Sequence, residues 1–474
     1  MNKSFIFKII GMFMLITLMS IAVSYVNGII IERKQRQFEV KADIARSSAR
    51  EQTVIGPVLV VPYVQEYPEL IEVNKTQKVV TRSYAGKVYL LPDELNLKGV
   101  FTNEVKSLGI YKALMYQLGG NIDGSFKIPK NLGLKFEHEN TALKIGDAYL
   151  SVGIADTRGV SGKPILNWGG QSVSFEQGSK IEALGSGINA PLMALNAAEA
   201  QTIKFDFKLS LRGTENFNFT PIAENNAITL NTSWQSPHFY GSFLPDAGTQ
   251  KIDNNGFSAK WAVSSLSSNN QAALMNNLKD GTAQPTHWDG VVGAAAPART
   301  LESLSVGFVE PINVYSQSDR ATKYGLLFIG LTFAGFFIFE ILKHLRIHPA
   351  QYTFVGLAMA LFYLLLISLA ERIGFAYAYL SASSACVGLL GYYLSYVLKS
   401  KANGLMFASM LTALYGALYG ILASEDNALL MGSLLVFGLL ALVMIITRKV
   451  DWYQISGKDA PVNPVQSHSA YDVV

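Results

Sequence analysis

Long apolar runs near both ends of the chain constrain its fold more than any other feature. Residues 9–31 contain no charged side chain, and five further runs follow Lys323, at residues 324–342, 352–370, 373–398, 404–422 and 429–447. A helix rises about 1.5 Å per residue, so each run can cross a hydrocarbon core about 30 Å thick. The sequence therefore predicts an integral membrane protein with six transmembrane helices and excludes a soluble cytosolic enzyme.

The first apolar run favours a signal anchor that stays attached to the mature chain. It is longer than the core of a cleavable signal peptide, and Ile31 passes directly into Glu32 and Arg33 without a small-residue cleavage site. The following residues, 32–55, contain no Gly or Pro and place apolar side chains at spacings of three and four. They predict a helical stalk that continues the first span.

The stalk carries a cluster of basic residues that allows two interpretations. The cluster comprises Arg33, Lys34, Arg36, Lys41, Arg46 and Arg50. These side chains either form a solvated helix face or lie beside lipid phosphates.

Basic residues in the loops predict the orientation of the spans, because Lys and Arg resist translocation. Lys343, Arg346, Lys399, Lys401, Arg448 and Lys449 follow the second, fourth and sixth runs. The intervening loops carry Glu371 with Arg372, and Glu425 with Asp426, so they are neutral or acidic. This pattern predicts cytoplasmic termini and an external region at residues 32–323. The basic residues of the stalk favour the opposite orientation of the first span, but long domains translocate largely regardless of flanking charge.

The external region after the stalk, residues 56–323, has the pattern of a β-rich domain. Runs rich in Val, Ile, Tyr, Phe and Thr are separated by turn residues. The clearest are residues 58–64, 78–91, 143–154, 172–176, 202–211, 227–233 and 256–263. Residues 203–211 alternate apolar and polar side chains, as in an antiparallel strand with one wet face. Helical periodicity is weak and confined to residues 190–200 and 266–278, so we expect a sandwich-like fold or paired β subdomains.

Charge and cysteine content limit the possible functions of the external region and the interactions that stabilise it. The chain has 39 basic and 35 acidic residues, and a net charge of +4 is too small an excess for nucleic-acid binding. The only cysteine, Cys386, lies in the fourth span, so the external domain has no disulfide and depends on core burial for stability. We expect the lipid bilayer as a partner and no nucleic acid.

A search for catalytic motifs predicts no catalytic residue, no metal site and no cofactor. The sequence contains no H-E-x-x-H, no G-x-S-x-G and no Gly-Lys followed by Ser or Thr. The six histidines are His138, His238, His287, His344, His348 and His468. Those of the external region do not have the spacing of metal ligands on one helix.

Asp156 and Arg158 are the first candidates for a binding site. They stand between glycines at the end of an expected strand, where opposite charges form either a structural turn or a binding pair. Asp319, Arg320 and Lys323 enter the second span and form either head-group anchors or a binding site.

Glu340 is a further candidate because it is an ionisable residue inside an apolar span. Lys343 and His344 are one turn away, so a partly hydrated ion pair at the cytoplasmic interface is the alternative to a proton relay. His348, in the loop that follows, completes the set of candidate binding residues.

Several strings resemble a known family. The most specific are SDRATKYGLLF at residues 318–328, FFIFE at 336–340 and LRIHPAQY at 345–352, supported by IGP at 55–57, SVGIADTRG at 151–159, FLP at 243–245 and DWY at 451–453. Together they resemble the CreD family of bacterial inner-membrane proteins, known as cell envelope integrity proteins. Residues 66–81 and the tail after Lys458 match poorly.

The resemblance implies an inner-membrane protein of Gram-negative bacteria, produced in response to a two-component system and linked to envelope integrity and the β-lactam response. It implies no known reaction and supplies no catalytic residues. The expected organisation is an anchor at residues 1–31, a periplasmic stalk at 32–55, a periplasmic β-rich domain at 56–323, a five-helix transmembrane domain at 324–449 and a cytoplasmic tail at 450–474.

Three functions remain open. The first is a non-enzymatic factor that supports envelope integrity under envelope or β-lactam stress, with a β domain that binds a periplasmic protein or wall component; the missing motifs and the near-neutral external charge favour it. The alternative is a small-solute transporter or channel, which deep polar pairs between helices would indicate. The third is a periplasmic enzyme, which would require His238 or His287 to meet a carboxylate in a cleft.

Overall fold

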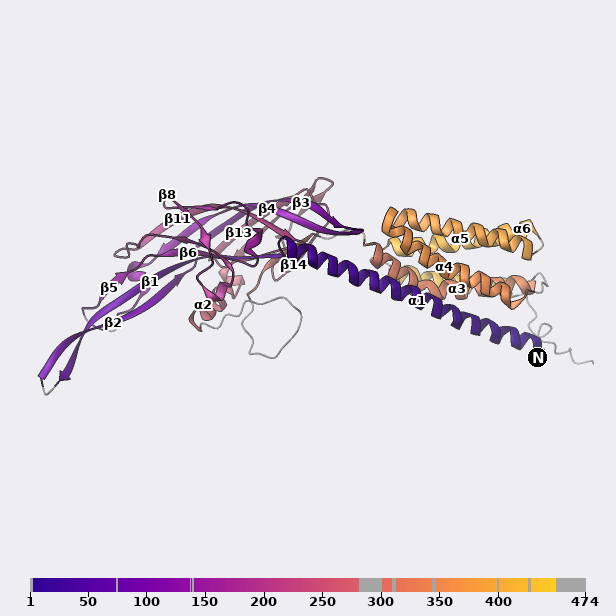
Figure 1. Ribbon diagram of the computed structural model, residues 1–474, viewed down its shortest axis with the longest axis horizontal. Helices are drawn as coiled ribbons and strands as arrows, with labels where there is room; N and C mark the ends of the chain where they lie inside the picture. The colour runs from indigo at the N-terminus through magenta and orange to yellow at the C-terminus, as the bar shows by residue number, and fades with distance from the viewer. Residues whose placement is uncertain are drawn as a thin grey trace, which may run out of the picture. The chain divides into compact units, whose positions relative to one another are not determined.

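The computed structural model describes residues 3–73, 76–136, 138, 140–280, 301–308, 313–342, 347–398, 400–424 and 428–448 (Figure 1). The chain divides into two compact units, one of residues 1–37 with 312–474 and the other of residues 38–311. Helix α1 (Lys3–Ser47) contributes residues to both units.

The first unit consists of helices. It contains the N-terminal part of α1 together with α3 (Val314–Leu342), α4 (Pro349–Ile373), α5 (Phe375–Val397), α6 (Lys401–Ala423) and α7 (Ala428–Thr447). Within the described residues, α1 and α3 to α6 are five helices long and apolar enough to cross a membrane. These confirm five of the expected spans. Helix α7 coincides with the sixth expected span, and its described apolar part is Leu430–Ala441.

Small residues set the turns and the packing of the last spans. Gly374 separates α4 from α5 with φ at +82°, a left-handed conformation that favours glycine. Gly404 of α6 faces the backbone of Ser395 on α5, where an added Cβ would lie 2.7 Å from the Ser395 Cα. The small side chains of this pair of helices are therefore used for their own close packing.

The second unit is built on two β-sheets. The first sheet has the order β14 (Pro237–Gly241), β17 (Leu304–Phe308), β12 (Asn216–Thr220), β1 (Gln52–Val73), β6 (Tyr149–Ile154), β10 (Gly187–Pro191), β9 (Glu176–Gln177), with β2 (Thr76–Leu90) and β5 (Ala142–Ile145) also paired to β1. The second has the order β15 (Lys251–Asp253), β16 (Gly256–Ser264), β13 (Asn225–Thr232), β3 (Glu94–Leu108), β4 (Tyr111–Ile128), β11 (Gln201–Thr214), β7 (Ile165–Trp168), β8 (Gln171–Ser174).

One apolar core joins the two sheets. Phe101 and Tyr116 from the second sheet meet Phe217 and Phe308 from the first, with ring centroids 5.0 to 6.3 Å apart. Strand β11 buries Phe205 and every second residue after it, as its alternation predicted. The expected sandwich-like domain is confirmed.

The structure corrects two details of the expected β domain. Each sheet contains one parallel pair, β1 with β12 and β3 with β13, so neither sheet is purely antiparallel. The expected weak helix at residues 190–200 is wrong, because β10 ends at Pro191 and the following residues are irregular. The second weak helical stretch corresponds to α2 (Asn270–Asp280).

Candidate functional site

Asp156 and Arg158 fasten the end of α1 to the loop after β6. Asp156 accepts hydrogen bonds from the backbone N–H groups of Arg158 and Arg50. The Arg158 guanidinium meets the same carboxylate twice, with Nε 2.9 Å from Oδ1 and Nη2 2.6 Å from Oδ2. Its Nη1 donates to the carbonyl oxygen of Arg46 at 2.7 Å, near the last turn of α1. The arrangement is that of a structural junction, and a binding role for the pair stays a prediction.

Gln52 and Thr214 complete this junction. The Gln52 amide donates to the carbonyl oxygens of Asp156 and Arg212 at 3.0 and 2.9 Å, and the Thr214 hydroxyl donates to the carbonyl oxygen of Ala49 at 2.7 Å. The side-chain hydrogen bond from the guanidinium lowers the pKa of Asp156 below its ordinary value, although partial burial acts in the opposite direction. Asp156 is therefore ionised throughout the neutral range.

Glu340 lies near the C-terminal end of α3 and has only 5% of its surface exposed. Its Oε2 accepts the Tyr352 hydroxyl at 2.9 Å, and its Oε1 accepts the N–H of Ile347 at 3.2 Å. The expectation of a partly hydrated carboxylate is therefore wrong, because the following helix covers it. Lys343 and His344, its expected ion-pair partners, lie outside the described residues.

His348 caps the N-terminus of α4, next to this carboxylate in the fold. Its Nδ1 accepts the N–H of Ala350, and its own N–H is accepted by Oε1 of Gln351, each at 3.2 Å. Pro349 occupies the first turn of α4. Backbone N–H groups in the first turn of a helix have no acceptor within the helix, so the N–H that proline lacks costs no helical hydrogen bond. The cap fixes the start of α4 and so places Tyr352 over Glu340. The structure thus brings two separately predicted residues, His348 and Glu340, into one α3–α4 turn.

Asp319, Arg320 and Lys323 occupy the first turns of α3. The Lys323 amino group lies 2.8 Å from the Asp319 carboxylate, one helical turn away. Between them, the Thr322 hydroxyl reaches Asn27 of α1 at 3.1 Å. This local ion pair agrees with the anchoring interpretation, while a binding role for the three residues stays a prediction.

A polar layer that joins α1, α3 and α4 was missed by the sequence analysis. The Tyr315 hydroxyl donates to Oε1 of Glu371 at 3.1 Å, and Nε of Arg33 lies 3.8 Å from the same oxygen. Asn313 donates to the side-chain oxygen of Gln37 at 3.2 Å. These partners are far apart in the sequence, so no local spacing signals their contact.

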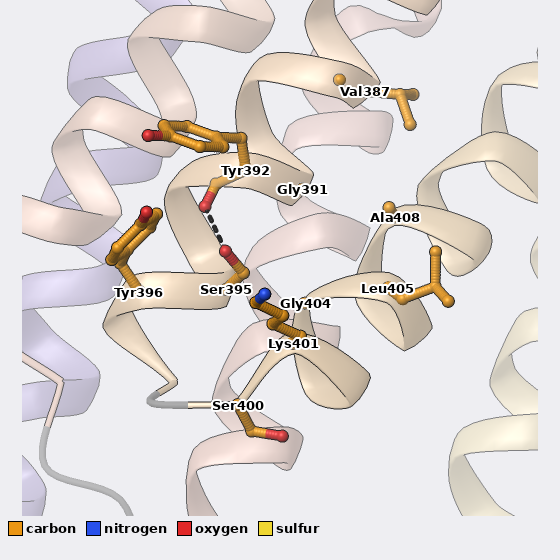
Figure 2. Close-up of a pocket in the computed structure, with 11 residues that line it drawn as sticks. Val387, Gly391, Tyr392, Ser395, Tyr396, Ser400, Lys401, Gly404, Leu405 and Ala408 are labelled. Carbon is orange, nitrogen blue, oxygen red and sulfur yellow. Dashed lines mark hydrogen bonds between the residues drawn. The ribbon is translucent and has the colours of Figure 1, made fainter.

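A groove follows the seam between α5 and α6 (Figure 2). One part encloses about 740 Å³ and is lined by residues that include Tyr392, Ser395, Lys401 and Gly404. An adjoining part of about 690 Å³ shares Val387 and Gly388 with the first. Figure 2 shows the Ser395 hydroxyl turned to the carbonyl oxygen of Tyr392, 2.7 Å away. The groove therefore has mainly apolar and small walls with polar side chains at the Lys401 end.

Polar contacts between helices lie beside this groove. The Tyr379 hydroxyl donates to the carbonyl oxygen of Tyr415 at 2.7 Å, and the Tyr415 hydroxyl lies 3.4 Å from Sγ of Cys386. All three side chains are buried. They are buried polar contacts between α5 and α6, without an ionised side chain in either pair.

Strands β1 and β2 extend beyond the rest of the first sheet. Along the edge opposite β2, strand β1 pairs with β5 as far as Glu66. Beyond that point, among the described strands, residues 67–73 of β1 pair only with residues 76–82 of β2. We call these two segments the arm. Figure 1 shows the arm as a narrow two-stranded ribbon that leaves the β unit. Leu70 and Val79 face each other across it, with 66% and 61% of their surfaces exposed.

The described residues contain no group of three His, Cys, Asp or Glu side chains positioned to hold a metal ion. His238 lies on the edge strand β14 and stacks on Tyr240, with the ring centroids 5.4 Å apart. His287, the other histidine considered for catalysis, lies outside the described residues.

Comparison with known proteins places the chain in a family. Residues 4–453 match the family model described as "Inner membrane protein CreD". The chain is also 31% identical over 457 residues to the protein named "Inner membrane protein CreD" from Escherichia coli (strain K12), and the match covers 96% of each chain. Both descriptions agree with the long apolar helices of the first unit. This chain therefore belongs to the CreD family of inner membrane proteins.

Proposed function

We propose that the protein is a non-enzymatic inner-membrane factor that supports cell envelope integrity under envelope or β-lactam stress. Its β unit binds a periplasmic protein or a wall component. The termini lie in the cytoplasm and residues 32–323 lie in the periplasm, an orientation supported by the basic loops after the second, fourth and sixth expected spans.

The arm is the observation that carries this proposal. An isolated two-stranded ribbon is marginally stable in water, and an exposed apolar pair on it adds a further cost. The cross-strand ion pair between Glu69 and Arg82, at 2.6 Å, is exposed and contributes little. Binding a partner along the ribbon would bury Leu70 and Val79 and satisfy open strand edges, so the arm has the features of a docking element.

A shortened arm tests the proposal. Glu66 and Ser83 face each other in the register, so a two-residue Asn-Gly turn can replace residues 67–82 without changing the remaining pairs. We expect the shortened protein to insert and accumulate normally but to lose complementation in an envelope-stress assay. Complementation equal to that of the full chain, at equal abundance, would overturn the proposal.

Two substituted proteins separate docking from stability. Leu70→Ser with Val79→Ser removes the exposed apolar pair of the arm and should also abolish complementation. Ile165→Ser with Ile252→Ser removes two exposed apolar side chains from other strands of the same unit and should leave complementation unchanged.

Transport is the second candidate function, favoured by the buried contacts among Tyr379, Cys386 and Tyr415. If these groups serve a conduction path, purified protein in liposomes should dissipate a proton gradient followed with a pH-sensitive dye. Tyr415→Phe, which removes the hydroxyl beside Cys386, should then slow the dissipation. Equal rates in empty liposomes, wild-type protein and variant would contradict this second candidate.

A further inference from the structure

Strand β2 gives the first sheet a long open edge. Its 15 residues pair with β1 without a register shift, from Leu90 opposite Leu59 to Thr76 opposite Val73. Among the described strands β2 has no second neighbour, so on its other side no strand satisfies its backbone N–H and C=O groups. We call this side the β2 edge. A long open edge is a template for pairing with another strand.

The arm has a second open edge, along β1, and Pro68 interrupts it. Gly146 donates its N–H to the carbonyl oxygen of Pro62, so the backbone polar groups of Pro62 face the β5 side and not β2. This direction alternates along an antiparallel ladder, and Pro68 follows an even number of residues later in the same unshifted register. Pro68 therefore faces the open side. Because proline has no N–H, the β1 edge lacks a donor directly beyond the end of β5.

The same alternation identifies the donors of the β2 edge. Pro68 is opposite Thr81, so the backbone polar groups of Thr81 also point away from the β1–β2 ladder. The N–H of Val79 points the same way, because Val79 lies two residues from Thr81. Strand β2 contains no proline, so this edge keeps all of its donors. The β2 edge is therefore the side of the arm on which an added strand can form a complete ladder.

The side chains of β2 differ between the two faces of the arm. Lys78 and Arg82 lie on one face, because side chains alternate along a strand, and Val79 lies on the other, where 61% of its surface is exposed. Strand β2 has three basic residues and no acidic one. Arg82 is paired with Glu69, whereas the exposed Lys78 has no carboxylate partner among the described side chains. A strand that matches this edge places acidic side chains on the face of Lys78 and apolar ones on the face of Val79.

We propose that the arm recognises its partner by strand addition, in which an extended segment with alternating acidic and apolar residues pairs with the β2 edge at residues 77–83. Hydrogen bonds with the backbone of Val79 and Thr81 supply affinity, and the alternating side chains supply specificity. A second copy of this chain would bring one basic β2 edge against another, which disfavours it as the occupant. This inference rests on the proposed docking function of the arm and adds the edge and the chemistry of the partner.

Peptide binding to the purified full-length protein tests the chemistry of the partner. The probe is a fluorescent peptide of alternating Val and Glu, long enough to span residues 77–83. Fluorescence anisotropy should give a Kd at least about tenfold lower than that of the same peptide with Lys in place of Glu. Methylation of the backbone nitrogens of the peptide should abolish binding. Equal affinity for the two peptides, no binding of the acidic one, or binding that survives methylation would overturn the proposal.

Two substitutions locate the binding edge. Thr81→Pro removes one outward N–H, and Lys78→Glu reverses a charge without a change to the backbone. We expect the Kd for the acidic peptide to rise at least about tenfold and at least about threefold, respectively. Thr81→Val, which keeps the N–H, and Lys208→Glu, on the exposed face of β11, should leave the Kd unchanged. An unchanged Kd in Lys78→Glu would contradict the proposal even if Thr81→Pro disturbs the arm.

Complementation separates this inference from the proposed function. Thr81→Pro should lose complementation in the envelope-stress assay, as the shortened arm should, while Thr81→Val should keep it. If the shortened arm loses complementation and Thr81→Pro keeps it at equal abundance, the arm docks through another surface and the assignment of the β2 edge is wrong. If the shortened arm itself keeps complementation, the docking function fails and the inference fails with it.

Discussion

The Arg158 guanidinium joins the turn after β6 to Arg46, 112 residues earlier in the chain, because it holds the Asp156 carboxylate at 2.6 Å while it donates to the carbonyl oxygen of Arg46 at 2.7 Å. The last turn of α1 is thereby fixed to the β unit. This relationship explains why the Asp-Thr-Arg sequence stands at the end of β6.

Removal of Arg158 should destabilise the β unit. Arg158→Ala loses both bonds to the carboxylate and the bond to Arg46, and we expect a loss of about 1–3 kcal/mol in unfolding free energy. Tryptophan fluorescence can follow unfolding of the purified protein, because Trp168 and Trp261 are buried in this unit. Lys144→Ala, which breaks an exposed pair with Glu66, should cost less than about 1 kcal/mol. Equal effects of the two substitutions would argue against a structural junction.

Acidic pH should remove the contribution of Asp156 to the stability of the folded protein. Its pKa is lowered in the folded protein, so its stabilising effect is fully present above the usual pKa of about 3.9 and is lost as the pH falls through the lower folded value. Asp156→Asn should therefore be less stable than the wild type at neutral pH, and the difference should shrink below about pH 4. In an Arg158→Ala background the pH dependence of this difference should weaken. A difference that is constant with pH would contradict the assignment.

Glu340 should be a structural residue of the α3–α4 turn. Glu340→Gln keeps an acceptor oxygen but loses the charge that receives two hydrogen bonds, and we expect a cost of about 1–3 kcal/mol because the group is buried. Tyr352→Phe, which removes one of the donors, should have a similar or smaller effect on thermal unfolding. Envelope complementation should survive Glu340→Gln. Loss of complementation at normal protein level would favour a proton relay instead.

The membrane orientation can be tested with alkaline phosphatase fusions. Fusions after Ala200, Glu371 and Glu425 should be active because these positions are predicted to be periplasmic, and fusions after His348, Lys401 and Lys458 should be inactive. An inactive fusion at Ala200, with the fusion protein present at normal level, would reverse the predicted topology.

The apolar helices and much of the β unit were predictable because their patterns are local. Strand β4 was missed because its glycines suggest a break in a strand. In the structure Gly124 lies against β3, where an added Cβ would be 2.0 Å from the carbonyl oxygen of Glu94. The absence of a side chain at this position is therefore a requirement of sheet packing.

The candidate site depended on contacts that a local pattern does not contain. Glu340 was recognised as unusual, but its burial depends on Tyr352 of the next helix. Of the arm, only residues 78–82 fell within a predicted strand, because the projection of residues 67–73 beyond the sheet depends on where β5 ends, opposite Glu66. Parallel pairing of β1 with β12 joins segments far apart in the sequence.

Photocrosslinking at the arm in living cells tests the central claim most directly. A photoreactive amino acid at Val79 should form a discrete crosslinked product with a periplasmic protein or wall component under envelope stress, whereas one at Ile165, on another exposed strand of the same unit, should not. Substitution of Leu70 by Ser should reduce the Val79 product, because the two side chains face each other. The same products at both positions, or no product at Val79 at normal protein abundance, would contradict the claim that the arm is the docking element.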